Sequence, residues 1–168
     1  ASLDPATDSD IATVAENDDD NVAVKIVTGQ NGVEGGDAVE YSIVLIDNVS
    51  GDTLTNVLGA SFTGSIGYSN TADIDDFAET NFETTFTIAD GESIVDLSYN
   101  PENDSNFELD TLTATISSLN TVSSIMPAIA IASANAGIDD DAILVVTTTQ
   151  NGEEELNVPI QYTVTLRN

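Results

Sequence analysis

The chain has 168 residues, and 30 acidic residues against 2 basic ones give it a formal net charge of −28 at pH 7. It has no His, Cys or Trp, which removes imidazole bases, thiol nucleophiles, disulfides and the usual ligands of zinc and haem. With only Lys25 and Arg167 to neutralise phosphates, we expect no nucleic acid partner and no anionic membrane surface. No apolar run approaches the ~20 residues of a membrane span, so we expect no membrane insertion.

The large negative charge opposes folding into a compact structure. Hydrophobic residues make up 40% of the chain, enough for a core, but repulsion among the carboxylates opposes compaction unless cations bind. Divalent cations are therefore the first partners to consider. Few Lys, many Thr, Ser, Asn and Asp, and no Cys are typical of large bacterial surface proteins, so we expect an extracellular or cell-surface location. An acidic cytosolic or halophilic protein has a similar composition.

Alternating apolar and polar residues predict strands along most of the chain, each bounded by Gly, Asn, Asp or Pro. The predicted strands are 22–28, 39–46, 56–63, 84–88, 93–99, 111–117 and 125–132. Asp90-Gly91 predicts a tight hairpin between two of them. No window is long enough and rich enough in helix formers for a helix. The predicted fold is all-β, a Greek-key, immunoglobulin-like β-sandwich of about seven strands.

A long repeat divides the chain. After a shift of 120 places, Asp19-Asp20 falls on Asp139-Asp140 and Gln30-Asn31-Gly32 on Gln150-Asn151-Gly152, with Tyr41 one place out of register with Tyr162. Repeats of this length are tandem domains. We therefore expect residues 1–20 to be the end of a preceding unit or an acidic linker, 21–141 to be one sandwich, and 142–168 to be the first two strands of a following unit or an exchanged strand segment.

The segment 142–168 needs a partner, because an isolated two-stranded hairpin is marginal in water. We expect it to pair with neighbouring domains of the same protein or with identical subunits.

Acidic residues gather in the predicted turns. Calcium takes about six to eight oxygen ligands in flexible geometry, and converging loops can supply them. A solvated acidic surface is the alternative for any single cluster, but Asp18-Asp19-Asp20 and Asp139-Asp140-Asp141 both precede the first strand of a unit, which favours calcium. A carboxylate pair also serves glycosidases, yet these enzymes use aromatic platforms for sugars and only 5% of residues here are aromatic. We expect no enzyme.

Five motifs in order resemble Calx-β domains over residues 21–141. They are Glu34-Gly35-Gly36, the segment 71–77, the segment 86–92, the segment 107–112 and the segment 138–141. The resemblance implies a Calx-β-type sandwich that binds calcium at one end. The implied ligands are Glu34, Asp76, Asp104, Glu108, Asp139, Asp140 and Asp141.

The chain departs from the family pattern before the sixth strand. Members that bind several calcium ions have consecutive Asp residues there, whereas this chain has Asn103-Asp104-Ser105. The resemblance then implies fewer ions or weaker binding, with the Asp triplets acting across junctions between units. Asp18, Asp19 and Asp20 are expected to meet loops of the sandwich, and Asp139 to Asp141 to meet Glu153 to Glu155.

The sequence therefore predicts a non-enzymatic calcium-binding structural module of an extracellular adhesin-type repeat protein, in which calcium stiffens the domain junctions. The alternative is a subunit of an extracellular filament or sheath, assembled by strand exchange (donor-strand complementation) through residues 142–168 or 2–16. A third reading is glycan binding, with Tyr68, Phe77 and Tyr99 stacking on a sugar ring.

Overall fold

The structure is a computed structural model that describes residues 21–72, 74–103, 109–120, 125–140, 143–150, 152 and 159–167. Within these residues there is one 3₁₀ helix, η1 (Ile74–Asp76), and no helix long and apolar enough to cross a membrane. The strands are β1 (Val22–Gln30), β2 (Gly32–Val33), β3 (Val39–Asp47), β4 (Phe62–Ser69), β5 (Thr85–Ile88), β6 (Ile94–Tyr99), β7 (Asp110–Leu119), β8 (Ala128–Ile131), β9 (Ser133–Asp139), β10 (Ile143–Gln150) and β11 (Gln161–Arg167).

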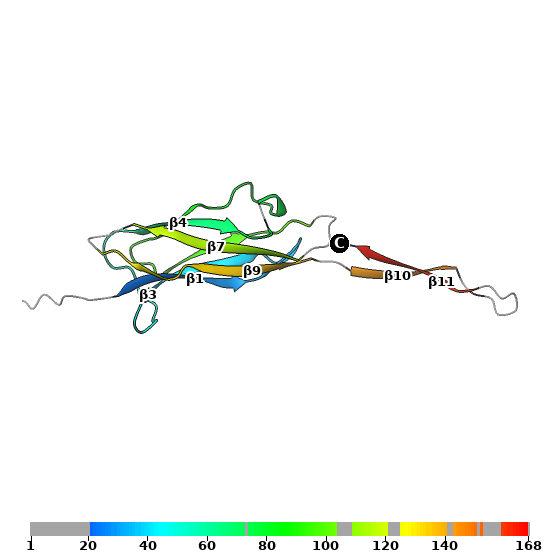
Figure 1. Ribbon diagram of the computed structural model, residues 1–168, viewed down its shortest axis with the longest axis horizontal. Coiled ribbons are helices and arrows are strands. Elements are labelled where there is room, and N and C mark those ends of the chain that lie inside the picture. The colour runs from blue at the N-terminus through cyan, green and yellow to red at the C-terminus, as the bar shows by residue number, and fades with distance from the viewer. Residues whose placement is uncertain are drawn as a thin grey trace, which may run out of the picture.

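Two sheets form a sandwich, and a separate hairpin follows it (Figure 1). The four-stranded sheet has the order β6-β3-β1-β8, and the five-stranded sheet has the order β2-β9-β7-β4-β5. Sequence neighbours β3 and β4 lie in different sheets, as do β5 and β6, which is the crossed connection of Greek-key sandwiches. The predicted all-β sandwich is confirmed.

The core lies between the sheets and is built by the predicted alternation. Val39, Tyr41, Ile43 and Leu45 on β3 are all buried and face residues such as Leu112 on β7. The Tyr41 hydroxyl donates a 2.6 Å hydrogen bond to the Leu112 carbonyl and so links the two sheets. Each buried aliphatic or aromatic side chain contributes about 1.5–3 kcal/mol by leaving water.

The strand predicted near 56–63 starts later than expected, because residues 56 to 60 form a loop and β4 begins at Phe62. Asn56 is buried and holds this loop. Its side-chain amide donates hydrogen bonds to the carbonyls of Ala60 at 2.8 Å and Ile88 at 3.1 Å. These bonds give the loop backbone partners that a strand would otherwise provide.

The Asp90-Gly91 turn does not form a hairpin. β5 pairs with β4 in one sheet and β6 pairs with β3 in the other, so the turn carries the chain between sheets. Gly91 has φ +87°, a conformation that suits glycine at such a corner. The strand predicted at 125–132 is likewise divided: β8 pairs with β1, and the chain then changes sheet into β9.

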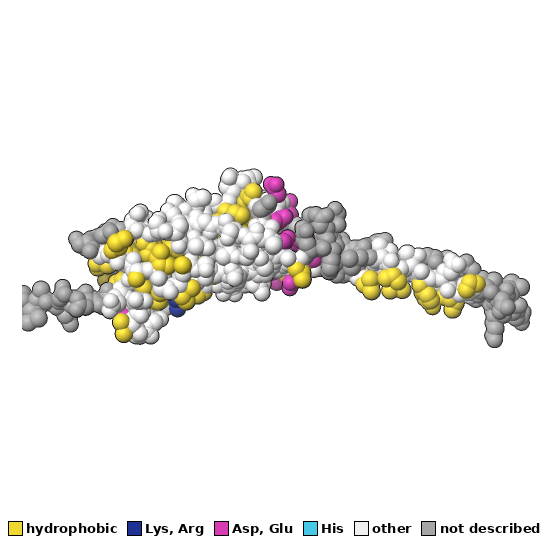
Figure 2. Space-filling model, viewed as in Figure 1, with side chains coloured by type: hydrophobic (Ala, Val, Ile, Leu, Met, Phe, Trp, Pro, Cys, Tyr) yellow, Lys and Arg dark blue, Asp and Glu magenta, His cyan; other side chains and the backbone are white. Residues whose placement is uncertain are grey.

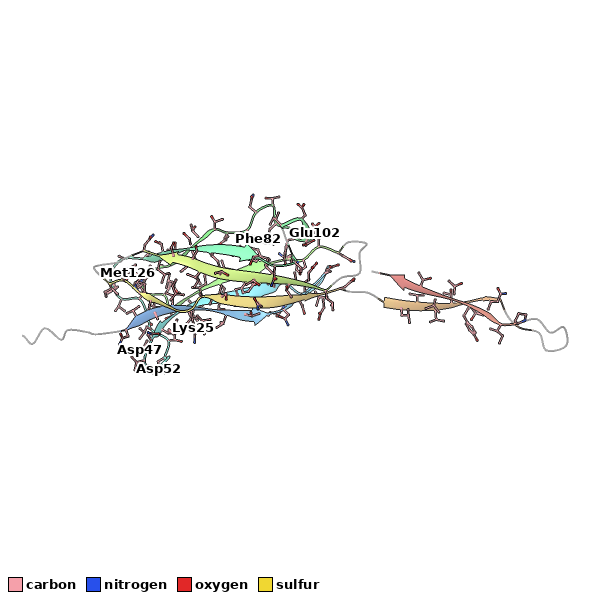
Figure 3. The ribbon with its side chains drawn as sticks, in the orientation of Figure 1. Lys25, Asp47, Asp52, Phe82, Glu102 and Met126 are labelled. Carbon is pink, nitrogen blue, oxygen red and sulfur yellow. The ribbon has the colours of Figure 1, made fainter. Side chains whose placement is uncertain are left out.

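The chain crosses the sandwich from end to end. It enters β1 at one end and leaves β9 at the other, where the hairpin of β10 and β11 extends away (Figure 1). Asp47, Asp52 and Met126 lie near the entry end, and Glu102 lies near the exit end (Figure 3). β10 and β11 form a two-stranded sheet of their own, and in the described residues neither pairs with a strand of the sandwich.

Candidate calcium site at the exit end

The Glu34 loop and the end of β9 are joined by backbone pairing. β2 runs parallel to β9, with Val33 opposite Asp139, and the Glu34 amide donates a 3.0 Å hydrogen bond to the Asp139 carbonyl. The Glu34 residue is only 6% exposed. This pairing brings residues more than a hundred positions apart to one end of the sandwich.

The same loop also contacts the segment that follows β6. The Gly35 amide donates to the Pro101 carbonyl at 3.0 Å, and the Glu102 amide donates to the Asp76 carbonyl at 2.9 Å. Gly35 has φ +63°, and a Cβ there would lie 3.1 Å from the Asn103 Cβ, so glycine suits the position. Through these bonds η1, with Asp76, reaches the end that carries Glu34.

Carboxylate oxygens are shielded from water at this end. Both Oδ atoms of Asp140 are buried and accept no hydrogen bond, and the Oε2 atom of Glu34 is buried as well. A carboxylate enclosed in this way without a compensating partner costs several kcal/mol when it is ionised. The Asp140 carboxylate is therefore a candidate for binding a cation.

The structure places part of the predicted ligand set together. Glu34, Asp76, Asp139 and Asp140 all lie at the exit end, where Figure 2 shows acidic side chains gathered on the sandwich. Within the described residues, however, no group of three or more acidic side chains is close enough to hold a metal ion. The remaining predicted residues, Asp104, Glu108, Asp141, Asp18, Asp19 and Asp20, lie outside the described residues, as do Glu153 to Glu155.

Glu102 also lies at this end and was not among the predicted ligands. Its side chain is exposed, and the hydrogen bond from its backbone amide to the Asp76 carbonyl holds the residue beside η1. The acidic pattern Glu102-x-Asp104 was the signal in the sequence, but it did not distinguish a residue near the site from an ordinary surface charge.

The aromatic residues proposed for glycan stacking pack on one another instead. Phe77 and Tyr99 are buried, and Phe82 contacts both, with ring centroids 5.1 and 5.0 Å away. Tyr68 packs 4.7 Å from Phe82, and its hydroxyl lies 2.6 Å from that of Tyr99. Burial raises the pKa of both tyrosines. The glycan expectation is wrong for Phe77 and Tyr99, because buried rings offer no open face to a sugar.

No family model matches the chain, and no curated protein matches its sequence. Among solved structures, the chain is similar to the apo form of the Calx CBD1 domain, with 14% identity, a TM-score of 0.49, and coverage of 71% of this chain and 98% of that chain. It is similar to the calcium binding domain CBD12 of CALX1.1, with 11% identity and a TM-score of 0.48, covering 73% of this chain and 55% of that one.

A third similar structure is a type I cohesin–dockerin complex from Clostridium thermocellum, with 13% identity and a TM-score of 0.41, covering 70% of this chain and 94% of that chain. Because the TM-scores of these three structures are below 0.5, the likenesses do not decide what the chain binds.

Proposed function

We propose that the chain is a non-enzymatic, calcium-binding structural module of an extracellular adhesin-type repeat protein. The observation that carries the proposal is the Asp140 carboxylate, whose two oxygens are buried without a hydrogen bond. A bound divalent cation offsets the cost of enclosing that charge.

The residues at the exit end fit calcium in their chemistry. Calcium prefers carboxylate and carbonyl oxygens and tolerates irregular geometry, whereas magnesium requires a near-ideal octahedron. Asp140 and Glu34 supply buried carboxylate oxygens, and backbone hydrogen bonds keep Asp76 and Asp139 at the same end of the sandwich. Asp104, Glu108 and Asp141 complete the proposed ligand set, as the Calx-β resemblance implies.

The position of the site supports a mechanical role. It lies where the chain leaves β9 toward the hairpin, so an ion here ties the Glu34 loop to the exit strand. Neutralising the carboxylates also removes their repulsion at the point where one unit joins the next. Asp18, Asp19 and Asp20 occupy the corresponding place at the preceding junction by the sequence repeat.

Calcium titration of matched variants tests the proposal. Asp140→Asn keeps the shape of the side chain but removes its charge, and we expect calcium affinity measured by calorimetry to fall by about tenfold or more. Asp52→Asn makes the same charge change near the opposite end and should leave the affinity of the site unchanged. Equal calcium binding by wild type and Asp140→Asn would contradict the proposal.

The second candidate function is a filament or sheath subunit that assembles by strand exchange. The observation that favours it is the exposed apolar side chains of β10 and β11, among them Leu144 and Val164. Analytical ultracentrifugation distinguishes it: a filament subunit assembles as its concentration rises, and a chain without residues 142–168 does not.

A further inference from the structure

The hairpin of β10 and β11 repeats the pairing of β1 and β3. Both pairs are antiparallel, and Thr28 opposite Tyr41 corresponds to Thr148 opposite Tyr162. The register then shifts at the same step in each first strand, between Thr28 and Gln30 and between Thr148 and Gln150. A shared register and a shared irregularity at the same place show that the two hairpins have the same backbone design.

The side chains also correspond, but their environments are opposite. Val146 faces Val164 across the hairpin as Ile26 faces Ile43 across β1 and β3. Ile26 and Ile43 are at most 1% exposed, whereas Val146 and Val164 are 57% and 59% exposed. Figure 2 shows hydrophobic side chains along one side of the hairpin.

Leu144 and Tyr162 complete this apolar face, at 67% and 61% exposure, where the corresponding Val24 and Tyr41 are fully buried. The face is therefore the inner face of a core whose other half is not among the described strands.

The sandwich itself shows what covers such a face. β9 and β7 of the opposite sheet pack on β1, and β9 also contacts β3. Their inward residues include Leu112, Ala136 and Ile138. The natural cover for β10 and β11 is thus an antiparallel sheet with small and aliphatic side chains at the corresponding positions.

Residues 1–20 of another copy are a poor cover. In the repeat alignment, Glu16 falls on the buried Ala136 and Asp18 on the buried Ile138. Carboxylates at those two positions would be enclosed without partners. The five-stranded sheet of another copy is no better, because it already packs on β1 and β3 of that copy. If it packed on β10 and β11 instead, it would leave the apolar face of that β1 and β3 exposed.

We propose that β10 and β11 are the first hairpin of a second sandwich of the same fold, covered by a sheet of the β2-β9-β7-β4-β5 kind that follows Asn168 on the same polypeptide. The first sandwich is contiguous in the chain, and the second hairpin begins one repeat length later, which favours a cover in the same chain. This inference does not depend on calcium binding.

A lengthened polypeptide, called the extended chain below, tests the inference. Residues 48–141, which follow β3 in the first unit, are repeated after Asn168 so that they follow β11. We expect amide hydrogen exchange in β10 and β11 to slow by about a hundredfold or more relative to the 168-residue chain, because a core now encloses them. Protection of the first sandwich in the same molecule is the internal control that the polypeptide is folded.

Two variants of the extended chain identify the face. Val164→Asp places a charge on the apolar face and should abolish the protection of β10 and β11, whereas Thr163→Asp on the opposite face should preserve it. Unprotected hairpin strands in the extended chain would overturn the proposal. Concentration-dependent dimers of the 168-residue chain that Val164→Asp abolishes would overturn it too, because a second copy would then be the cover.

A replacement variant tests the equivalence without requiring a new domain to fold. In this variant residues 142–168 replace residues 22–47, and we expect the sandwich to retain cooperative thermal unfolding because the inserted apolar residues match the core positions. If this chain does not fold, the two hairpins are not equivalent and the proposal fails.

Discussion

The core around Gly64 has no room for a larger side chain. This glycine lies on β4, and a Cβ there would sit 2.5 Å from the Phe86 ring and 2.6 Å from the Ser118 carbonyl. We predict that Gly64→Ala lowers the free energy of unfolding by about 1–3 kcal/mol, as overpacking does in other cores. Chemical denaturation measures the change.

Gly67 on the same strand is the matched control, because nothing lies within 4 Å of a Cβ built there. Gly67→Ala should be neutral or slightly stabilising, since alanine suits an open strand position better than glycine. Equal destabilisation by the two substitutions would show that the crowding around Gly64 is not the cause.

At the residue scale, the sequence predicted acidic residues that the fold gathers, but not the environment of their side chains. Glu34, Asp76, Asp139 and Asp140 were predicted from motifs, and the structure places all four at one end. Their common location could not be predicted from spacing, because the parallel pairing of β2 with β9 joins residues about a hundred positions apart. The role of Asn56 was missed for the same reason: its partner at Ile88 is distant in sequence.

The turn after β3 shows how a charged side chain holds an element's end. The Asp47 Oδ1 accepts hydrogen bonds from the amides of Val49 at 2.7 Å and Ser50 at 3.0 Å. These amides, that of Ser50 first, hold the pKa of the carboxyl below its ordinary value. The lowered pKa in the folded state means that ionised Asp47 stabilises this turn.

We predict a pH-dependent effect of Asp47→Asn. The stabilisation by ionised Asp47 is fully present above the unfolded carboxyl pKa of about 3.9 and is lost as pH falls through the lower folded value. Wild type should therefore be more stable than Asp47→Asn near neutral pH, with the difference disappearing in acid. A difference in unfolding free energy that stays constant from neutral to acid pH would contradict this assignment.

At the element scale, alternation predicted strands well but not the sheets they join. β5 and β6 were both expected, yet they belong to different sheets although only Ala89 to Ser93 separate them. Alternation of apolar and polar residues predicts which side chains of a strand face inward, but it does not predict which sheet the strand joins. The short β2 was missed because two residues cannot show a period.

For the whole molecule, the charge of −28 makes stability sensitive to cations. We predict that calcium raises the thermal unfolding temperature of the chain, because an ion that binds only the folded state adds about 2.7 kcal/mol at a hundredfold excess over its Kd. Scanning calorimetry in calcium and in chelator, both at about 0.15 M NaCl so that general screening is equal, measures the shift.

Magnesium at the same concentration separates binding from screening. It carries the same charge, so general screening predicts the same rise in unfolding temperature, whereas a calcium site predicts a larger rise with calcium. Asp140→Asn should respond to the two ions alike. A calcium response of Asp140→Asn as large as that of wild type would place the effect elsewhere on the molecule.

The parallel pairing of β1 with β8 has a consequence for a chain under tension. β1 begins at the entry end, and β8 leads directly into β9, which leaves at the exit end. A pulling force along the polypeptide would draw β1 and β8 past each other lengthwise. Their hydrogen bonds lie across that direction, so they would have to break together rather than one at a time, and the unit would resist extension until they do.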